Sequence, residues 1–187
     1  MRNIIVITGS SRKNGNSDLL ANAFIEGATK AGHTVSLFEA GRKNISGCVG
    51  CETCYSTENA CSFNDDFNVL APMIENSDMI VFCTPLYWYT FPAKLKAAID
   101  KMYSFLIGRR KRKGKDAILL ACGDAHNDGD FDGLSKTYEL ILKSIGWNDA
   151  GQLLIAKTYK IGDINKTDGL EKAKNMGLNI KDKIITI

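Results

Sequence analysis

Residues 4–17 read IIVITGSSRKNGNS, and this stretch decides the fold. Residues 4–8 are apolar and mostly β-branched, which predicts a buried parallel strand. Glycine, hydroxyl and basic side chains follow, and then a helical pattern of apolar residues runs from Leu19 to Ala31. We expect Ser17 to cap the start of this helix and Gly32 to follow its end. A strand, a polar turn and a helix in this order indicate an α/β fold.

Strand-like and helix-like segments alternate along the rest of the chain. Apolar runs predict further strands over residues 34–38, 79–83, 117–122 and 153–156. Helical spacing predicts helices that begin near Asp65, extend from Pro92 to Leu106, cover Leu134 to Ile145, and extend from Leu170 to Ile184. Five such strands fit the flavodoxin-like doubly wound order, a parallel sheet with helices on both faces. In that order the loops after the first, third and fourth strands lie together at one edge of the sheet.

Length and composition narrow the class of protein. The 187 residues predict a single domain over 1–187, and the net charge of +3 is too small to indicate a nucleic-acid partner. We expect no membrane partner, because no apolar run approaches the roughly 18–20 residues of a membrane span. The N-terminal residues turn polar too soon for a signal peptide. We therefore expect a cytoplasmic protein, whose thiols stay reduced.

The loop after the first predicted strand has the composition of a phosphate-binding site. It is rich in hydroxyl groups and glycine, and it ends at a helix N-terminus, which attracts anions. It contains neither a Walker sequence nor the G-x-G-x-x-G dinucleotide fingerprint. A hydroxyl-rich loop with one arginine suits a terminal monophosphate, such as that of FMN, and we assign the contacts to Ser10, Arg12, Asn16 and Ser17. The alternative is a surface turn that only caps a helix.

Large apolar side chains crowd the loop after the third predicted strand, where residues 84–91 read TPLYWYTF. These side chains either pack into the core or an oligomer interface, or they wall a flat ligand such as a flavin ring. Backbone N–H groups in this loop would also stabilise negative charge on a reduced flavin. The candidate ring contacts are Pro85, Leu86, Tyr87, Trp88, Tyr89 and Thr90.

The loop after the fourth predicted strand begins with Gly123 and Asp124. It either closes over the pyrimidine edge of the flavin or is a mobile polar turn.

Four of the six cysteines fall in a loop at about residues 44–64, where residues 48–61 read CVGCETCYSTENAC. Four thiolates are the ligand count of a [4Fe–4S] cluster, which makes Cys48, Cys51, Cys54 and Cys61 candidate ligands. A structural zinc site also takes four thiolates, but its usual two-pair layout with a long spacer is absent. A redox dithiol of Cys51 and Cys54 is a further alternative. The last alternative is that all four thiols are free.

Together these motifs resemble the NADPH-dependent FMN reductase superfamily, over roughly residues 1–125. The quoted segments are residues 9–17, residues 48–61 with the Asp65-Asp66-Phe67 that follows, and residues 84–96. Within the superfamily they are most similar to the iron–sulfur flavoproteins and their cysteine-bearing relatives. The resemblance implies FMN phosphate contacts from Ser10, Arg12 and Ser17, and ring contacts from residues 85–90. It also implies a homodimer or homotetramer whose flavin site lies near a neighbouring subunit, and a cluster held by a similar set of four cysteines.

The expected function is that of an FMN-dependent NAD(P)H oxidoreductase. Hydride transfer to a flavin needs no acid or base side chain, so we assign no catalytic residue. The electrons would pass to a quinone, a free flavin, a nitro or azo compound, or a bound cluster. One alternative is a ferredoxin-linked electron-transfer protein without its own small-molecule substrate. Another is a flavin-free protein whose pocket binds a different phosphorylated ligand.

A basic run at residues 109–115 precedes the fourth predicted strand. We expect a solvated loop there. The run would also suit the 2′-phosphate of NADPH or an oligomer contact.

Overall fold

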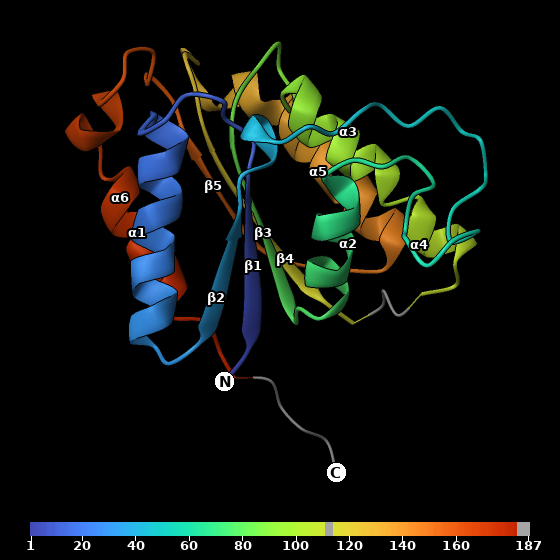
Figure 1. Cartoon of the computed structure of the whole chain (residues 1–187). Coiled ribbons are helices and arrows are strands. Elements are labelled where there is room, and N and C mark those ends of the chain that lie inside the picture. Colours follow the sequence, from blue (N-terminus) through green and yellow to red (C-terminus); the bar gives the residue numbers. More distant parts are fainter. Residues whose placement is uncertain (111–113, 183–187) are drawn as a thin grey trace.

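The computed structural model describes residues 1–110 and 114–182, and it contains a five-stranded parallel sheet (Figure 1). The strands lie in the order β2-β1-β3-β4-β5, and every neighbouring pair is parallel. This order confirms the predicted flavodoxin-like fold. The strand bounds are Asn3–Thr8 for β1, Thr34–Phe38 for β2, Met79–Pro85 for β3, Asp116–Cys122 for β4 and Asn148–Ile155 for β5.

Helices cover both faces of the sheet. Figure 1 shows α1 and α6 on one side, and α2, α3, α4 and α5 on the other. Within the described ranges no helix is both long and apolar enough to cross a membrane. The α-helices are α1 Asn16–Lys30, α2 Phe67–Glu75, α3 Ala93–Lys101, α4 Ser104–Ile107, α5 Asp132–Ile145 and α6 Gly169–Leu178; the short 3-10 helices are η1 Ala40–Arg42, η2 Asp128–Phe131 and η3 Asp163–Lys166.

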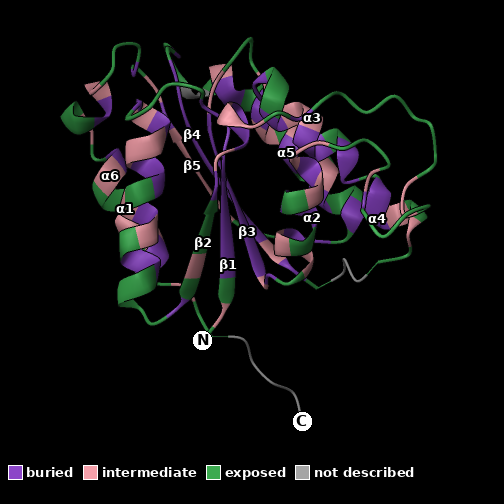
Figure 2. Cartoon of the chain, viewed as in Figure 1, coloured by how far each residue is buried: buried purple, intermediate pink, exposed green. Residues whose placement is uncertain are grey.

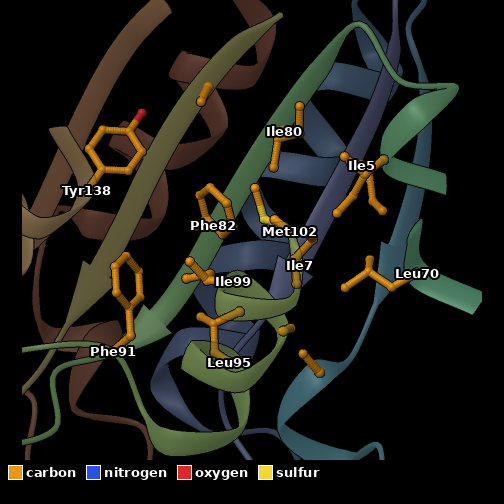
Figure 3. Close-up of a cluster of buried hydrophobic side chains, with 14 of the residues drawn as sticks. Ile5, Ile7, Leu70, Ile80, Phe82, Phe91, Leu95, Ile99, Met102 and Tyr138 are labelled. Carbon is orange, nitrogen blue, oxygen red and sulfur yellow. The ribbon is translucent and has the colours of Figure 1, made fainter. Parts of the chain in front are cut away.

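The two layers of helices enclose two apolar clusters, one on each face of the sheet. Ile5 and Ile7 of β1 face the α2 and α3 side, while Ile4 and Val6 face the α1 and α6 side. Figure 3 shows the first cluster, in which the ring of Phe82 lies between other aromatic and aliphatic side chains. The central strands are buried on both faces (Figure 2), as expected for a parallel sheet.

Three predicted helix boundaries are wrong. The helix that follows the first loop begins at Asn16 after an extended Gly15, so Ser17 is a buried residue of the first turn and not the cap. The helix predicted to reach Leu106 ends at Lys101, because Met102 and Tyr103 donate to carbonyls three residues back and tighten the turn. The last helix ends at Leu178, and residues 183–184 of the predicted segment lie outside the described residues.

The fifth strand and the basic run also differ from the prediction. β5 begins at Asn148, five residues before the predicted start, because an edge strand tolerates polar residues such as Asp149 and Gln152. In the basic run, Lys115 is buried and binds the carbonyls of Glu75 and Ser77. Residues 111–113 of that run lie outside the described residues.

Helices α1 and α6 approach so closely that only glycine fits where they cross. A Cβ atom at Gly177 would collide with the carbonyl oxygen of Phe24 and the backbone nitrogen of Ala28. A Cβ atom at Gly27 would collide with the carbonyl oxygen of Lys174. Since these neighbours are backbone atoms, they cannot yield by changing rotamer.

The substitution Gly177→Ala should therefore lower the free energy of unfolding by about 1–3 kcal/mol, the usual cost of overpacking. Urea unfolding followed by circular dichroism measures this change. Gly47→Ala is the matched control, because a Cβ atom at Gly47 meets no atom within 4 Å. Equal stability of the two variants would contradict the close crossing of α1 and α6.

Candidate functional site

The three loops singled out from the sequence lie at the carboxyl edge of the sheet, and a backbone hydrogen bond joins each loop to the neighbouring strand. The N–H of Gly9, after β1, donates to the carbonyl of Cys83 at 2.9 Å. The N–H of Leu86, after β3, donates to the carbonyl of Cys122 at 2.8 Å, and the N–H of Gly123, after β4, donates to Ile155 at 3.1 Å. Each loop thus begins with a hydrogen bond to the end of the neighbouring strand.

Glycines let these loops pack against one another. A Cβ atom at Gly9 would lie 2.8 Å from the side chains of Leu95 and Thr84. A Cβ atom at Gly123 would lie 2.7 Å from Cβ of Leu86. The loop after β4 therefore packs directly on the loop after β3.

Loop 10–17 folds over the start of α1. Ser10 is 4% exposed, and its Oγ accepts the N–H of Arg12 at 3.1 Å. The Arg12 side chain is exposed, while its carbonyl accepts a hydrogen bond from Arg42 at 2.7 Å. The N–H groups of Arg12 and Asn14 already donate to Ser10 and Asp18, so an anion would meet the exposed Arg12 guanidinium and the N-terminus of α1.

Asn16 connects this loop to a segment that sequence reasoning missed. Its amide donates to the carbonyls of Thr158 and Lys160 at 3.2 and 2.9 Å. Its Oδ1 accepts the N–H groups of Gly162 and Ile164 at 2.9 and 3.3 Å. The side chain thus holds the segment after β5 beside the start of α1. Because every partner is a backbone atom, no motif in the sequence marks this segment.

The aromatic loop contains a tight turn with strained backbone. Tyr87 and Thr90 exchange two backbone hydrogen bonds, at 3.1 and 3.0 Å. Between them, Trp88 and Tyr89 have φ of 45° and 63°, the left-handed region that usually holds Asn or Gly in such turns. Each left-handed residue of this kind costs about 1–3 kcal/mol, and such strain clusters at ligand sites.

The large side chains of this turn point away from the core. Trp88 is 92% exposed and Tyr89 is 60% exposed, whereas Phe91 is buried. Core packing therefore accounts for Phe91 but not for Trp88 or Tyr89, for which a flat ligand or an oligomer interface are the alternatives. Of the other candidate contacts, Pro85, Leu86 and Thr90 are half-buried, while Tyr87 and Asp124 are exposed.

The cysteine loop is closed at its base by paired hydrogen bonds. The N–H of Asn44 donates to the Asp66 carboxylate at 2.7 Å, and the N–H of Asp66 returns to the carbonyl of Asn44 at 3.0 Å. The side chain of Asn68 accepts the N–H of Cys61 at 2.8 Å and donates to the carbonyls of Cys61 and Phe63. These bonds fix the end of the loop that carries the last cysteine.

All four loop cysteines line one small pocket. Cys48 and Cys51 are exposed, and Cys54 and Cys61 are half-buried. Burial raises the pKa of Cys54, and the neighbouring thiolates of Cys61, Cys51 and Cys48 raise it further. A hydrogen bond from Thr53, whose Oγ1 lies 3.1 Å from Sγ, lowers the pKa of Cys51. The other three thiols are therefore close enough to Cys54 to act on its charge.

The donor set suits a cluster, but the pocket that the four thiols share is small. Among residues 1–110 and 114–182, no group of three or more His, Cys, Asp or Glu is arranged to hold a metal ion. The pocket has a volume of about 20 Å³, enough for one water molecule. Four thiolates match a [4Fe–4S] cluster in number and chemistry, so Cys48, Cys51, Cys54 and Cys61 are the residues that would hold it.

The parallel sheet and its three carboxyl-edge loops place the chain in the flavodoxin-like class of α/β proteins. Residues 2–132 match the family described as NADPH-dependent FMN reductase, and the chain belongs to this family. It is an oxidoreductase with FMN as its cofactor and a nicotinamide nucleotide as electron donor. The resemblance read from the sequence is confirmed.

Known relatives agree with this assignment. An iron–sulfur flavoprotein of Methanocaldococcus jannaschii is 26% identical, covering 97% of this chain and 96% of the relative. One from Methanosarcina thermophila is 28% identical over 66% of this chain and 64% of its own length. The solved NAD(P)H:quinone oxidoreductase from Methanothermobacter marburgensis has the same fold, with a TM-score of 0.74, 21% identity and 97% of each chain covered.

The strained turn gives a test that separates backbone strain from ring contact. Trp88→Gly should raise the unfolding free energy of the flavin-free protein by about 1 kcal/mol, because glycine adopts positive φ at no steric cost. Trp88→Ala keeps the strain and should give no such gain. Both variants should bind FMN more weakly, as measured by quenching of flavin fluorescence. Unchanged FMN affinity in both would remove Trp88 from the proposed ring site.

Proposed function

We propose that FMN binds across the three carboxyl-edge loops of this chain. Loop 10–17 and the start of α1 would take the phosphate through Ser10, Arg12 and Ser17, with Asn16 bracing the neighbouring segment. Residues 85–90 would contact the ring, and Gly123 and Asp124 would close over its edge. The observation that carries this proposal is the turn that keeps Trp88 and Tyr89 exposed in strained backbone at the same edge.

Bound FMN supplies the redox chemistry, and the protein supplies orientation and electrostatics. Loop 10–17 fixes one end of the cofactor, while the aromatic turn sets the plane of the ring. Tyr89 and Trp88 are exposed, and a nicotinamide would stack beside the turn that carries them. The acceptor we propose is a small oxidant such as a quinone, a free flavin, or a nitro or azo compound, or a cluster held by the cysteine loop.

A second function is favoured by the four thiols that share one pocket. In this alternative the protein is an iron–sulfur flavoprotein that exchanges electrons with a ferredoxin and has no small-molecule substrate of its own. The cysteine pocket includes Lys101, at the end of α3, whereas the aromatic turn lies before the start of that helix. Nine residues of α3 span about 13 Å. The cysteine site is therefore separate from the proposed flavin site within one chain.

The proposed assembly is a homodimer or homotetramer in the cytoplasm, without nucleic-acid or membrane partners. A groove of about 420 Å³ between α3 and α5 supports self-association, since apolar side chains such as Met102, Leu106 and Leu140 line it. Leu140 is 54% exposed in the single chain. A second copy on this groove would remove that apolar surface from water.

The reductase proposal is tested by mixing the FMN-loaded protein anaerobically with NADPH or NADH. The flavin absorbance should bleach, because hydride transfer to the ring requires no further protein group. A flavin that stays oxidised with both nucleotides but bleaches with reduced ferredoxin would instead support the electron-transfer function. A colourless preparation that rejects added FMN would contradict both.

The cluster proposal is tested with Cys54→Ser, which removes the half-buried thiol at the centre of the set. After anaerobic reconstitution the variant should lose iron and sulfide while still binding FMN, because its flavin loops are intact. Cys83→Ala removes a buried core thiol and serves as the control that keeps its iron. Full iron content in Cys54→Ser, measured by iron and sulfide analysis, would eliminate this ligand set.

A further inference from the structure

Lys101 is a buried cation beneath the cysteine loop. It is the last residue of α3 and only 3% exposed, although lysine is rarely buried unless it is paired. Its partner is the Asp65 carboxylate, and both side chains are almost entirely buried. Lys101 lines the same pocket as the four thiols. The ion pair therefore borders the cysteines and not the solvent.

One ammonium group joins α3 to both ends of the loop and to one thiol. Nζ of Lys101 donates to the Asp65 carboxylate, to Oγ of Ser46 at 3.1 Å and to Sγ of Cys61 at 3.6 Å. It also lies 5.2 Å from the centre of the Phe63 ring. Ser46 precedes the first cysteine and Asp65 follows the last.

Stability alone does not account for this arrangement. Removing an ion pair from water costs about as much as the pair returns, so apolar side chains of similar size would stabilise the core as well. Burial raises the pKa of Asp65, but hydrogen bonds from Lys101, Ser46 and Phe67 outweigh burial and lower it overall. The carboxylate is thus charged at neutral pH. Its partner Lys101 also donates a hydrogen bond to the sulfur of Cys61.

We propose that Lys101 is the positioning residue of the four-cysteine pocket and supplies positive charge to it. This inference rests on the proposed role of the four cysteines as cluster ligands. Four thiolates around a [4Fe–4S] core leave a net negative charge, and charge and hydrogen bonds at the sulfurs set the reduction potential. An ammonium at Cys61 stabilises the reduced, more negative cluster more than the oxidised one. Lys101 therefore raises the potential.

The experiment compares variants that differ in which of the two buried charges they keep. Asp65→Asn removes the carboxylate, and Lys101→Met with Asp65→Asn removes both charges, so that no unpaired carboxylate stays buried. Lys101→Arg keeps the cation. Lys96→Met is the control, because Lys96 lies on the same helix but pairs with Asp100 near the surface. Each protein is reconstituted anaerobically with ferrous iron and sulfide, analysed for both, and titrated for its reduction potential by electron paramagnetic resonance.

The double variant should have a lower potential than Asp65→Asn, by roughly a tenfold change in the reduction equilibrium, about 59 mV for one electron. The reduction potential of Asp65→Asn alone should lie above that of the wild type, and the potentials of Lys101→Arg and Lys96→Met should stay near it.

Equal potentials in Asp65→Asn and the double variant, with iron bound in both, would overturn the role of Lys101 and leave the cluster intact. A wild type that takes up no iron or sulfide would overturn the cluster and this inference together. If the double variant fails to fold, an Asp65→Asn potential at or below that of the wild type would contradict the inference.

Discussion

The hydrogen bonds that connect each loop to the neighbouring strand are the interactions on which the site depends. Strands in a sheet lie about 4.8 Å apart, and the loops after β1, β3 and β4 inherit that spacing. Since Gly9, Leu86 and Gly123 each donate to the end of the next strand, the loops cannot drift apart while the sheet is intact. A ligand that spans the three loops thus binds a surface whose position is set by the buried strands of the sheet.

The features that were predictable from the sequence are those encoded locally. Apolar runs predicted the strands, and the glycine turn predicted the first loop, because both depend on neighbouring residues. The first turn of α1 was mispredicted because an extended Gly15 replaces the side-chain cap expected at Ser17. The turn at Trp88 and Tyr89 was not predicted, since neither is a residue type that favours positive φ.

Long-range polar contacts were beyond sequence reasoning. Asn16 binds backbone atoms that are more than 140 residues away in the sequence, and no residue pattern predicts such a bond. Lys101 resembles any lysine on an amphipathic helix until the fold buries it against Asp65. Both side chains act at points where separate segments meet, so that their roles follow from the tertiary structure.

The base of the cysteine loop is closed by hydrogen bonds that involve none of the four cysteines. Its ends are fixed by Asn44 with Asp66 and by Ser46 with Asp65, so the entropy of closing the loop is overcome before any residue between them is specified. Between these ends, Ala60 belongs to the apolar cluster beside α2 and α3, and Tyr55 and Cys61 pack against that cluster. The exposed stretch around Cys48 and Cys51 is therefore the part of the loop whose side chains can change without loss of core packing.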